Sequence, residues 1–501
     1  MLMNADAYRE SLRSYSPRVF INGEQVDCVA DDPRLLPGIN GVGVTYEFAQ
    51  QSAHHNIMTA VQKSSGKTVN RMLHINDGSD DLLNKLEAVR LVCKVAGCAQ
   101  RYLTQDALNG IFQATRRTDD NHGTDYHERF MAYLHEVQDQ DLTLGVAMTD
   151  AKGDRSNRPS EQVSADSYVH IKERRSDGIV IRGIKSIITG APYMHGLLVM
   201  PCRTHRAEDR DFAVCCAVPI DAKGLTIIAK PAGRPGAEAA RFSSQYGQST
   251  GMAVFEDVFV PYEKVFLEGE TEQGGFLTTT YATHHRHSCI GARAGFGDLL
   301  IGAGATMIKA NGLDADKHGH VRDAMVDLIT ITESFYACGI AASVYCEEDP
   351  AGNVMPDTVY ANIGKLLLAT KIYDMHRLAH YVSGGLVVAL PGPDEDHNPE
   401  TRASLTAVFQ GRQDISSEHR RDLSRFIEDL TVSDQAGWYS VISLHGGGSP
   451  EAMKREIWRN YDVEEKEDLV AQLLDRGVYD QGQRVSRQPG RCCAKGCSAD
   501  Q

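Results

Sequence analysis

The chain has 501 residues, of which 42% are hydrophobic and 24% are charged. This composition is ordinary for a globular protein with a large interior, and the length suits two or three domains. The formal net charge of −15 excludes nucleic acid and anionic membranes as main partners, because both repel an acidic protein.

The N-terminal residues carry charges where a secretory signal would need an apolar run. No run of about 18 apolar residues occurs, so we expect no membrane span. The twelve cysteines are irregularly spaced, which favours reduced thiols in the core and a cytoplasmic location. Cys492, Cys493 and Cys497 lie in a polar stretch over residues 481–501, which we predict to be a disordered tail rather than a metal site.

Residues 1–140 are predicted to form a mainly helical N-terminal domain. A small hairpin is expected at residues 18–28, with Asn22-Gly23 as its turn. Leucine and valine side chains recur at three- and four-residue spacing in residues 80–95, which predicts a helix with one apolar face.

Residues 141–275 change to alternating patterns and short apolar runs, which predict a central antiparallel β-domain. A hairpin is expected where residues 168–171 and 179–181 flank the turn at Asp177-Gly178. Further strands are predicted at residues 212–218, 225–229 and 252–260. Because no helices separate these strands, they favour a small sandwich or barrel.

Residues 276–480 return to helical periods and are predicted to form a helical bundle. One apolar stripe runs from Val321 to Phe335. A second helix begins after its N-cap Asp357 and runs toward Tyr381, and a third covers residues 417–430. Helices of this length predict an antiparallel bundle. The predicted fold class is therefore α+β, with an N-terminal helical domain, a central β-domain and a C-terminal bundle.

Three segments resemble the flavin-contacting motifs of a known family. They are residues 147–155, residues 182–190 and the turn Leu444-His445-Gly446-Gly447-Gly448-Ser449-Pro450. Together they identify the chain as a member of the 4-hydroxyphenylacetate 3-monooxygenase / 4-hydroxybutyryl-CoA dehydratase family, nearer the dehydratase branch. The resemblance implies an acyl-CoA dehydrogenase-like architecture, a homotetramer, and FAD held between the β-domain and the bundle.

The resemblance also implies which residues contact FAD. The glycines of the last motif let the backbone approach a ligand closely, and their N–H groups can hold a diphosphate. Thr149 and Thr189 are short donors suited to the edge of an isoalloxazine ring, while Arg155 meets a phosphate or forms a salt bridge within its own loop. The predicted cofactor-binding residues are Met148, Thr149, Arg155, Thr189, His445, Gly446, Gly447, Gly448 and Ser449.

The dehydratase branch of the family holds a [4Fe-4S] cluster on three cysteines and one histidine. By resemblance, two of these positions survive here, as Cys98 and His285. The other two are occupied by Tyr102 and Ala292, which cannot serve as ordinary cluster ligands.

Neighbouring positions depart from the dehydratase branch as well. Cys289 and Arg293 stand where that branch has a tyrosine and a lysine, and Thr250 and Ile442 stand where it has glutamates near the flavin. We therefore expect no cluster and no other metal. A rearranged cluster that recruits Cys93 and Cys289 is the alternative.

Arg101, Tyr102 and His285 are the predicted catalytic residues. Arg101 matches an arginine that the two-component monooxygenases of the family use on the substrate side. Tyr102 and His285 would supply a phenol and an imidazole near the flavin ring, where a histidine can move protons near neutral pH. His284 and His287 point in other directions on the same helix, so we expect them at the surface or between subunits.

Three functions follow from these observations. The first is a two-component FAD monooxygenase, or an oxidase, that uses O2 and reduced FAD from a separate reductase. Its substrate would be a small metabolite, aromatic or not. The histidine that anchors a phenol in such enzymes is Gly145 here, which argues against a simple phenol. The second is a cluster-free dehydratase or isomerase of CoA thioesters. The third is a flavin-binding protein with reduced catalytic activity.

Overall fold

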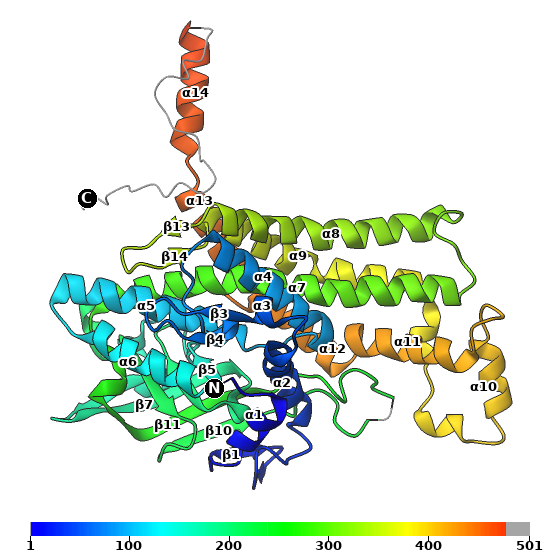
Figure 1. Cartoon of the computed structure of the whole chain (residues 1–501), viewed down its shortest axis with the longest axis horizontal. Coiled ribbons are helices and arrows are strands. Elements are labelled where there is room, and N and C mark those ends of the chain that lie inside the picture. Colours follow the sequence, from blue (N-terminus) through cyan, green and yellow to red (C-terminus); the bar gives the residue numbers. More distant parts are fainter. Residues whose placement is uncertain (1, 238, 477–501) are drawn as a thin grey trace.

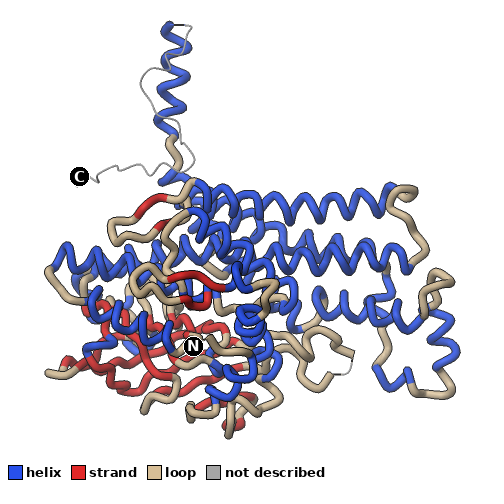
Figure 2. Tube along the Cα trace, in the orientation of Figure 1, coloured by secondary structure: helices blue, strands red, loops and turns tan. Residues whose placement is uncertain are grey.

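The computed structural model describes residues 2–237 and 239–476. Strands gather at one end of the molecule, and long helices lie beside them and cross its full width (Figure 1; strands are red in Figure 2). The predicted order of helices, then strands, then helices is confirmed. The predicted tail at residues 481–501, with its three cysteines, lies outside the described residues.

Helices dominate the first 140 residues. The helix predicted for residues 80–95 is confirmed as α4 (Ser79–Ala96), which packs against the bundle. Gly97 ends it with a φ of +68°, and a Cβ there would collide with Tyr439, so only glycine fits this turn. The other elements of this part are α1 (Ala5–Leu12), α2 (Leu36–Gln50), α3 (His55–Met58), α5 (Tyr102–His122), α6 (Tyr126–Asp139) and the hairpin of β3 (Thr59–Val61) and β4 (Thr68–Asn70).

Two sheets form the β-domain. The larger has six strands in the order β2 (Glu24–Gln25), β1 (Arg18–Ile21), β10 (Leu225–Ala229), β11 (Thr250–Pro261), β7 (Gly178–Thr189) and β6 (His170–Arg174). The smaller has four, in the order β12 (Val265–Glu268), β9 (Val214–Pro219), β8 (Gly196–Val199) and β5 (Leu144–Ala147). Buried aliphatic side chains of both sheets meet in one core cluster.

The hairpin predicted at residues 18–28 is confirmed, because β1 and β2 pair in an antiparallel register. The prediction of antiparallel strands throughout needs a correction. β1 pairs with β10 in parallel, and β5 pairs with β8 in parallel. An alternating pattern predicts a strand and its buried face, but it does not specify the direction of a partner that is distant in the chain.

The bundle is built on three long helices, α7 (Thr271–Ala310), α8 (Gly319–Val344) and α9 (Thr358–Ser383). The predicted N-cap is confirmed, since the Asp357 side chain accepts a hydrogen bond from the Tyr360 N–H at 2.8 Å. The helix predicted for residues 417–430 is α11 (Ser417–Thr431). The remaining elements are α10 (Arg402–Phe409), α12 (Asp434–His445), α13 (Pro450–Asn460), α14 (Val463–Arg476) and the short pair β13 (Glu347–Glu348) and β14 (Val354–Met355).

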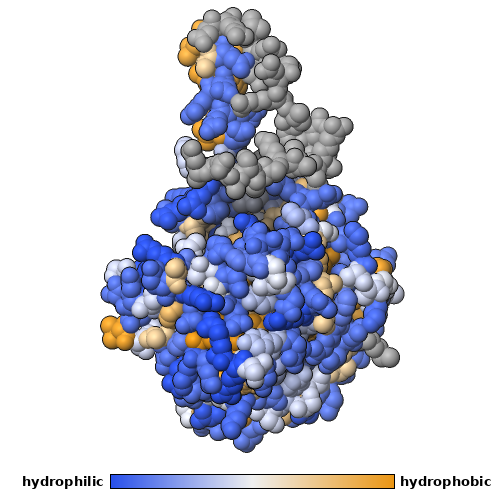
Figure 3. All heavy atoms as spheres, turned by 90° about the vertical axis from the view of Figure 1, so that its left-hand side faces the viewer, coloured by the Kyte–Doolittle hydropathy of each residue, from blue (hydrophilic) through white to orange (hydrophobic). Residues whose placement is uncertain are grey.

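Two surface features stand out. Among the described residues, α8 alone is long and apolar enough to cross a membrane by length and composition, a test that core helices of soluble proteins also pass. It packs on α7 and α9. Helix α14 projects from the body (Figure 1), and hydrophobic residues stand out on that projection against a mostly hydrophilic surface (Figure 3). Leu474 is its most exposed apolar side chain, at 81%.

Candidate active site

A small cavity of about 40 Å³ lies where the β-domain meets the helical bundle. Its walls come from the end of β7, the turn into α5, and the helices α7, α9 and α12. The residues that line it include Thr189, Tyr102, His285, Cys289, Lys365 and Trp438. Its apolar walls and few convergent titratable groups, rather than its volume, are typical of a small-molecule site.

Helix α7 contributes three reactive side chains to the cavity. His285, Cys289 and Arg293 follow one another at four-residue spacing, which places them on one face of the helix. Helices α4, α5, α8 and α9 pack around α7, so this face has a fixed direction.

A buried carboxylate holds the imidazole of His285. Nδ1 of His285 lies 3.0 Å from Oδ2 of Asp106 on α5. Oδ1 of Asp106 accepts hydrogen bonds from Nζ of Lys85 at 2.7 Å and from Oγ of Ser288 at 2.7 Å. We assign the Nδ1 proton to the bond with Asp106, which leaves Nε2 toward the cavity, 3.5 Å from Sγ of Cys289.

The pKa values of His285 and Lys365 lie in the reverse of their usual order. Burial lowers the pKa of His285, but the charge of Cys289 and the hydrogen bonds to Asp106 and Cys289 outweigh burial and raise it to about 10. Burial lowers the pKa of Lys365 to about 8. Two groups at one cavity whose pKa values are shifted in opposite directions suit a general acid and a general base. The imidazolium of His285 would donate a proton, and the neutral amine of Lys365 would accept one.

Lys365 and Asp106 were missed by the sequence reasoning. Lys365 is fully buried, and its Nζ donates to the carbonyl of Ser443 at 2.6 Å. The signal for it was present, because a lysine interrupts the apolar run from Ile363 to Leu368. Asp106 gave a weaker signal, since an acidic residue within a helix is more often on the solvated face.

Two further groups of the cavity carry polar atoms. The ring of Tyr102 lies nearly parallel to that of His285, with centroids 6.2 Å apart, and its hydroxyl is 3.4 Å from Sγ of Cys98. Nε of Arg293 donates to Oγ of Ser443 at 2.6 Å. Nη1 of Arg293 is buried without a hydrogen-bond partner among the described residues. An unpaired buried donor is costly, so this atom suits an acceptor on a ligand.

Arg101 is placed differently from Tyr102 and His285. It is fully buried, its Nη2 donates to the carbonyl of Asp141 at 2.9 Å, and its guanidinium stacks over the ring of Tyr46 at 3.8 Å. It is not among the residues that line the cavity. A role of Arg101 on the substrate side therefore stays a prediction.

The predicted FAD-binding residues fall into two groups. Thr189 and Gly446 line the cavity. Met148 and Thr149 lie in a loop that is tied to β7, where Lys185 Nζ donates to the Met148 carbonyl at 2.9 Å and Ser186 N–H donates to the Thr149 carbonyl at 2.7 Å. Arg155 is exposed further along this loop and forms no ion pair with any described residue.

The glycine-rich turn joins α12 to α13 at the edge of the cavity. His445 ends α12 and is exposed, and Ser449 is the N-cap of α13, where its side chain accepts from the Ala452 N–H. Gly447 and Gly448 have φ values of +74° and +101°, which favour glycine. Nε of Arg286 on α7 donates to the Gly447 carbonyl at 2.9 Å and fixes the turn against the bundle.

We expect Gly447→Val to weaken FAD binding by about tenfold, which corresponds to ~1.4 kcal/mol. A Cβ at Gly447 would lie 3.3 Å from Cδ2 of His285 and 3.4 Å from Cγ of Arg286 on a backbone that side chains rarely adopt. The turn would have to move away from the cavity. Titration of apoprotein with FAD measures the effect. Gly437→Ala, where an added Cβ meets open space, is the control; equal affinities for both variants would refute the role of the turn.

The donors at the cavity do not complete the set that a [4Fe-4S] cluster takes. Tyr102 and Ala292 line the cavity and offer no thiolate. Cys98, Cys289 and His285 also line it, whereas Cys93 is fully buried and is not part of the wall. The wall itself therefore offers three donors, one short of the usual four, and Cys93 lies behind it in hydrogen-bonding contact with Cys98. Thr250 and Ile442 carry no carboxylate. The hydroxyl of Thr250 accepts a hydrogen bond from Trp438 Nε1 at 2.9 Å, and Ile442 lines the cavity.

The lining of the cavity carries groups that suit contact with a flavin. The cavity is enclosed between the β-domain and the bundle, and Thr189 stands at one edge. The unpaired Nη1 of Arg293 offers a donor, and the glycine turn offers backbone that an added Cβ would obstruct. These features are what a planar ligand with acceptor atoms requires.

His284 and His287 correct an expectation. Both are completely buried rather than at the surface or between subunits. Nε2 of His284 is 3.1 Å from Oε1 of Gln113, and Nε2 of His287 is 2.8 Å from Oγ of Ser343. Because neighbouring helices surround the middle of α7, no residue from 280 to 301 is exposed.

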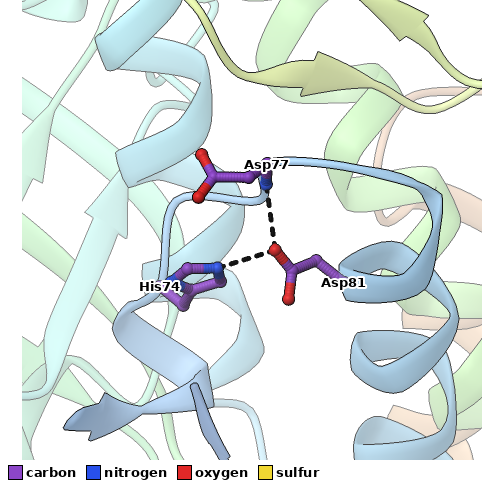
Figure 4. Close-up of side chains that lie close together, drawn as sticks. All are labelled: His74, Asp77 and Asp81. Carbon is purple, nitrogen blue, oxygen red and sulfur yellow. Dashed lines mark hydrogen bonds and ion pairs between the residues drawn. The ribbon is translucent and has the colours of Figure 1, made fainter. Parts of the chain in front are cut away.

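A second cluster of possible ligands, His74, Asp77 and Asp81, lies at the start of α4 (Figure 4). Oδ2 of Asp81 is already engaged by Nε2 of His74 at 2.9 Å and by the Asp77 N–H at 3.0 Å. A carboxylate oxygen of Asp77 lies within 4.8 Å of the ligand atoms of the other two residues, and Arg71 pairs with Asp81 at 3.2 Å. This group therefore stabilises the loop before α4 and is not a second active site.

Comparison with known proteins shows the family to which the chain belongs. A family model described as 4-hydroxyphenylacetate 3-hydroxylase N terminal matches residues 4–267, and the corresponding C terminal model matches residues 275–475. The chain is 36% identical to 4-hydroxybutyryl-CoA dehydratase/vinylacetyl-CoA-Delta-isomerase of Clostridium aminobutyricum, over 94% of this chain and 99% of that protein.

Solved structures confirm the predicted acyl-CoA dehydrogenase-like fold class. The oxygen-tolerant archaeal 4-hydroxybutyryl-CoA dehydratase from N. maritimus has a TM-score of 0.91 and 33% identity, covering 96% of each chain. The oxygenase component of 4-hydroxyphenylacetate 3-monooxygenase, in complex with FAD, has a TM-score of 0.83 and 20% identity, covering 95% of this chain and 98% of that one. Both branches thus share the fold, and the dehydratase branch is nearer in sequence.

Proposed function

The chain belongs to the 4-hydroxyphenylacetate 3-hydroxylase family, and from this premise we propose that it is a flavin-dependent lyase or isomerase of acyl thioesters that works without an iron–sulfur cluster. The acyl-thioester class is supported by the 36% identity to 4-hydroxybutyryl-CoA dehydratase/vinylacetyl-CoA-Delta-isomerase. The absence of a cluster is supported by the incomplete donor set at the cavity.

The observation that carries this proposal is that an imidazole, His285, and an amine, Lys365, line one cavity. Their pKa values, about 10 and about 8, are shifted in opposite directions. Both side chains lie against the same glycine turn, since a Cβ on Gly447 would be 3.3 Å from Cδ2 of His285 and 3.9 Å from Cε of Lys365. A proton acceptor and a proton donor side by side suit a reaction that takes a proton from one carbon and returns one to another.

The chemistry can be written with residues of this chain. The amine of Lys365 takes the acidic proton next to the thioester carbonyl. The unpaired Nη1 of Arg293 donates to the oxygen on which negative charge develops. The imidazolium of His285 gives a proton to the carbon at the far end of the allylic system, which moves the double bond. FAD, when bound, would supply electron transfer for the dehydration, and Thr189 with the glycine turn would hold it.

The direct test is to supply vinylacetyl-CoA and 4-hydroxybutyryl-CoA to the FAD-loaded protein and to measure product by chromatography. We expect conversion of vinylacetyl-CoA by protein that contains no stoichiometric iron or sulfide. Stoichiometric iron and sulfide would overturn the cluster-free proposal. No conversion of either thioester would overturn the lyase or isomerase proposal.

The pH profile gives a second prediction for the same reaction. We expect kcat/KM to rise as the pH passes about 8, because the amine of Lys365 must lose its proton, and to fall as the pH passes about 10, because the imidazolium of His285 must keep its proton. An optimum near pH 9 is unusual for a histidine enzyme. A profile that is highest near pH 6 and falls through neutrality would contradict both assignments.

A two-component monooxygenase is the second candidate. The observation that favours it is the phenol of Tyr102 stacked parallel to His285 beside an enclosed cavity, which could orient a substrate and stabilise a peroxide. Against it, Cys98 and Cys289 line the same cavity, and thiols there would react with peroxide. Supplying reduced FAD from a separate reductase and measuring oxygen uptake tests this candidate. Coupled hydroxylation of an added aromatic substrate would establish it over the lyase.

A homotetramer remains the prediction for the assembly. Several apolar side chains on the outer face of α8 are exposed in the single chain, among them Val326, Ile329 and Ile340. Exposed apolar positions on one helix favour contact with another copy. Light scattering coupled to gel filtration measures the mass and decides the assembly.

A further inference from the structure

The proposed reaction does not use the thiol of Cys289, which also lines the cavity. Cys289 lies on α7 one turn after His285, and its Sγ is 3.5 Å from Nε2 of that imidazole. Nδ1 of the same imidazole is 3.0 Å from Oδ2 of Asp106. A thiol, an imidazole and a carboxylate in this order are the arrangement that activates a cysteine for attack on a carbonyl.

The arrangement is rigid. His285 and Cys289 are held four residues apart on a helix that other helices surround, so their contact does not depend on a loop. Asp106 is fixed from its other side by Lys85 and Ser288, each at 2.7 Å. Cys289 is half-buried and lines the cavity, so its Sγ is within reach of a bound substrate.

The charges around Cys289 favour its thiolate. His285 and Arg293 face it from its own helix, Lys365 faces it from α9, and the phenol of Tyr102 faces it from α5. Burial raises the pKa of the Cys289 thiol, but the three positive groups outweigh burial and lower it.

We propose that Cys289 is a nucleophile that takes over the acyl group of a thioester substrate, with His285 as its proton partner and Asp106 as a positioning residue. This inference rests on the proposed function for its substrate class. The thiolate of Cys289 attacks the thioester carbonyl, and the bond between that carbon and the CoA sulfur breaks. The CoA thiolate takes the proton of the His285 imidazolium and leaves as free thiol, so that an acyl-Cys289 thioester and a neutral imidazole remain.

Cys98 does not offer the same chemistry. Its Sγ is 3.4 Å from the hydroxyl of Tyr102, and no imidazole of the described residues forms a hydrogen bond with it. A hydrogen bond with Cys93 lowers the pKa of the Cys98 thiol to about 6, but its side chain is only 1% exposed, whereas Cys289 is half-buried and is in contact with an imidazole. Acyl transfer is therefore assigned to Cys289 alone.

The test uses FAD-loaded protein and butyryl-CoA, whose saturated chain has no hydroxyl group to lose and no double bond to move. We expect rapid release of up to one CoA per chain, measured as free thiol, and one butyryl group on the peptide that contains Cys289 after an acid quench. Cys289→Ala should abolish both. Cys338→Ala, which removes a half-buried thiol outside the cavity, should leave both unchanged. No release by the wild type, or an acyl group on Cys98, would overturn the proposal.

His285→Gln separates a proton partner from a structural role. We expect it to slow CoA release by about 100-fold at pH 7, and the rate should recover as rising pH ionises the thiol without help. The alkylation rate of Cys289 by iodoacetamide should follow the same pH dependence. A rate that is unchanged by His285→Gln would overturn the role of the imidazole.

The two proposals fail in different ways. Release of CoA from butyryl-CoA by protein that does not convert vinylacetyl-CoA would overturn the proposed isomerase function and uphold acyl transfer. Conversion of vinylacetyl-CoA by protein that releases no CoA from butyryl-CoA would do the opposite.

Discussion

The His285→Gln variant is expected to lose about 100- to 10,000-fold in turnover of the thioester substrate, which is the usual contribution of a positioned general acid. Nε2 of His285 faces the cavity, and the pKa of about 10 keeps the ring protonated near neutral pH. Glutamine fills similar space and can still donate to Asp106, but it cannot give up a proton. Steady-state kinetics at pH 7 and at pH 9 measure the loss.

The matched control is His287→Gln on the same helix. His287 is equally buried, but it is hydrogen-bonded to Ser343 and does not line the cavity. We expect it to keep most of its turnover. Melting temperature and FAD content should be similar in both variants. An equal loss in both would mean that packing in α7, rather than proton transfer, limits the reaction.

The Asp106→Ala variant is expected to lose about 3–5 kcal/mol of stability, because it leaves the ammonium of Lys85 buried without its partner. Lys85 and Asp106 are both 0% exposed. Burial raises the pKa of Asp106, but Lys85 and His285 outweigh burial and lower it. A carboxylate with a lowered pKa stabilises the fold above its unfolded pKa and loses that effect in acid. The difference from wild type should therefore shrink below about pH 4. Urea unfolding measures it.

The double variant Lys85→Met/Asp106→Leu separates the two tasks of the carboxylate. Both charges are gone, so most of the stability should return. The imidazole of His285 still lacks its acceptor, so turnover should not return. A double variant as unstable as Asp106→Ala would show that the hydrogen bonds of Asp106 to His285 and Ser288, rather than the unpaired ammonium, dominate the loss.

The proposed thioester chemistry without a cluster accounts for the positions at which this site differs from the dehydratase branch. Tyr102 and Ala292 leave the cavity with a phenol and a methyl group where the resemblance places cluster ligands. Cys289 and Arg293 bring a thiol and a guanidinium to the same wall. In the proposed reaction, the thiol and the guanidinium would bind and polarise the thioester carbonyl through hydrogen bonds and charge, without iron.

The local elements were predictable because they depend on neighbours in the chain. The helix before Gly97, the N-cap at Asp357 and the hairpin at Asn22-Gly23 each follow from periodicity or from the capping and turn preferences of single residues. The flavin motifs were found in the same way, as short segments, and Thr189 and Gly446 do line one cavity.

Tertiary structure alone decided which of these segments meet. The parallel pairing of β1 with β10 joins residues about 200 positions apart, and no local pattern specifies it. The ion pair of Asp106 with Lys85, and the approach of Lys365 to the glycine turn, likewise join helices that are distant in sequence.

The sequence by itself determined the family and the order of helices and strands, and it predicted Tyr102 and His285 as site residues, which line one cavity. It could not determine their chemistry. A charge or a pKa depends on burial and on partners within a few ångströms, and those are set only when α5, α7 and α9 pack together. That packing brings His285, Lys365 and Cys289 to one cavity. The proposed roles of His285 as an acid and Lys365 as a base depend on it.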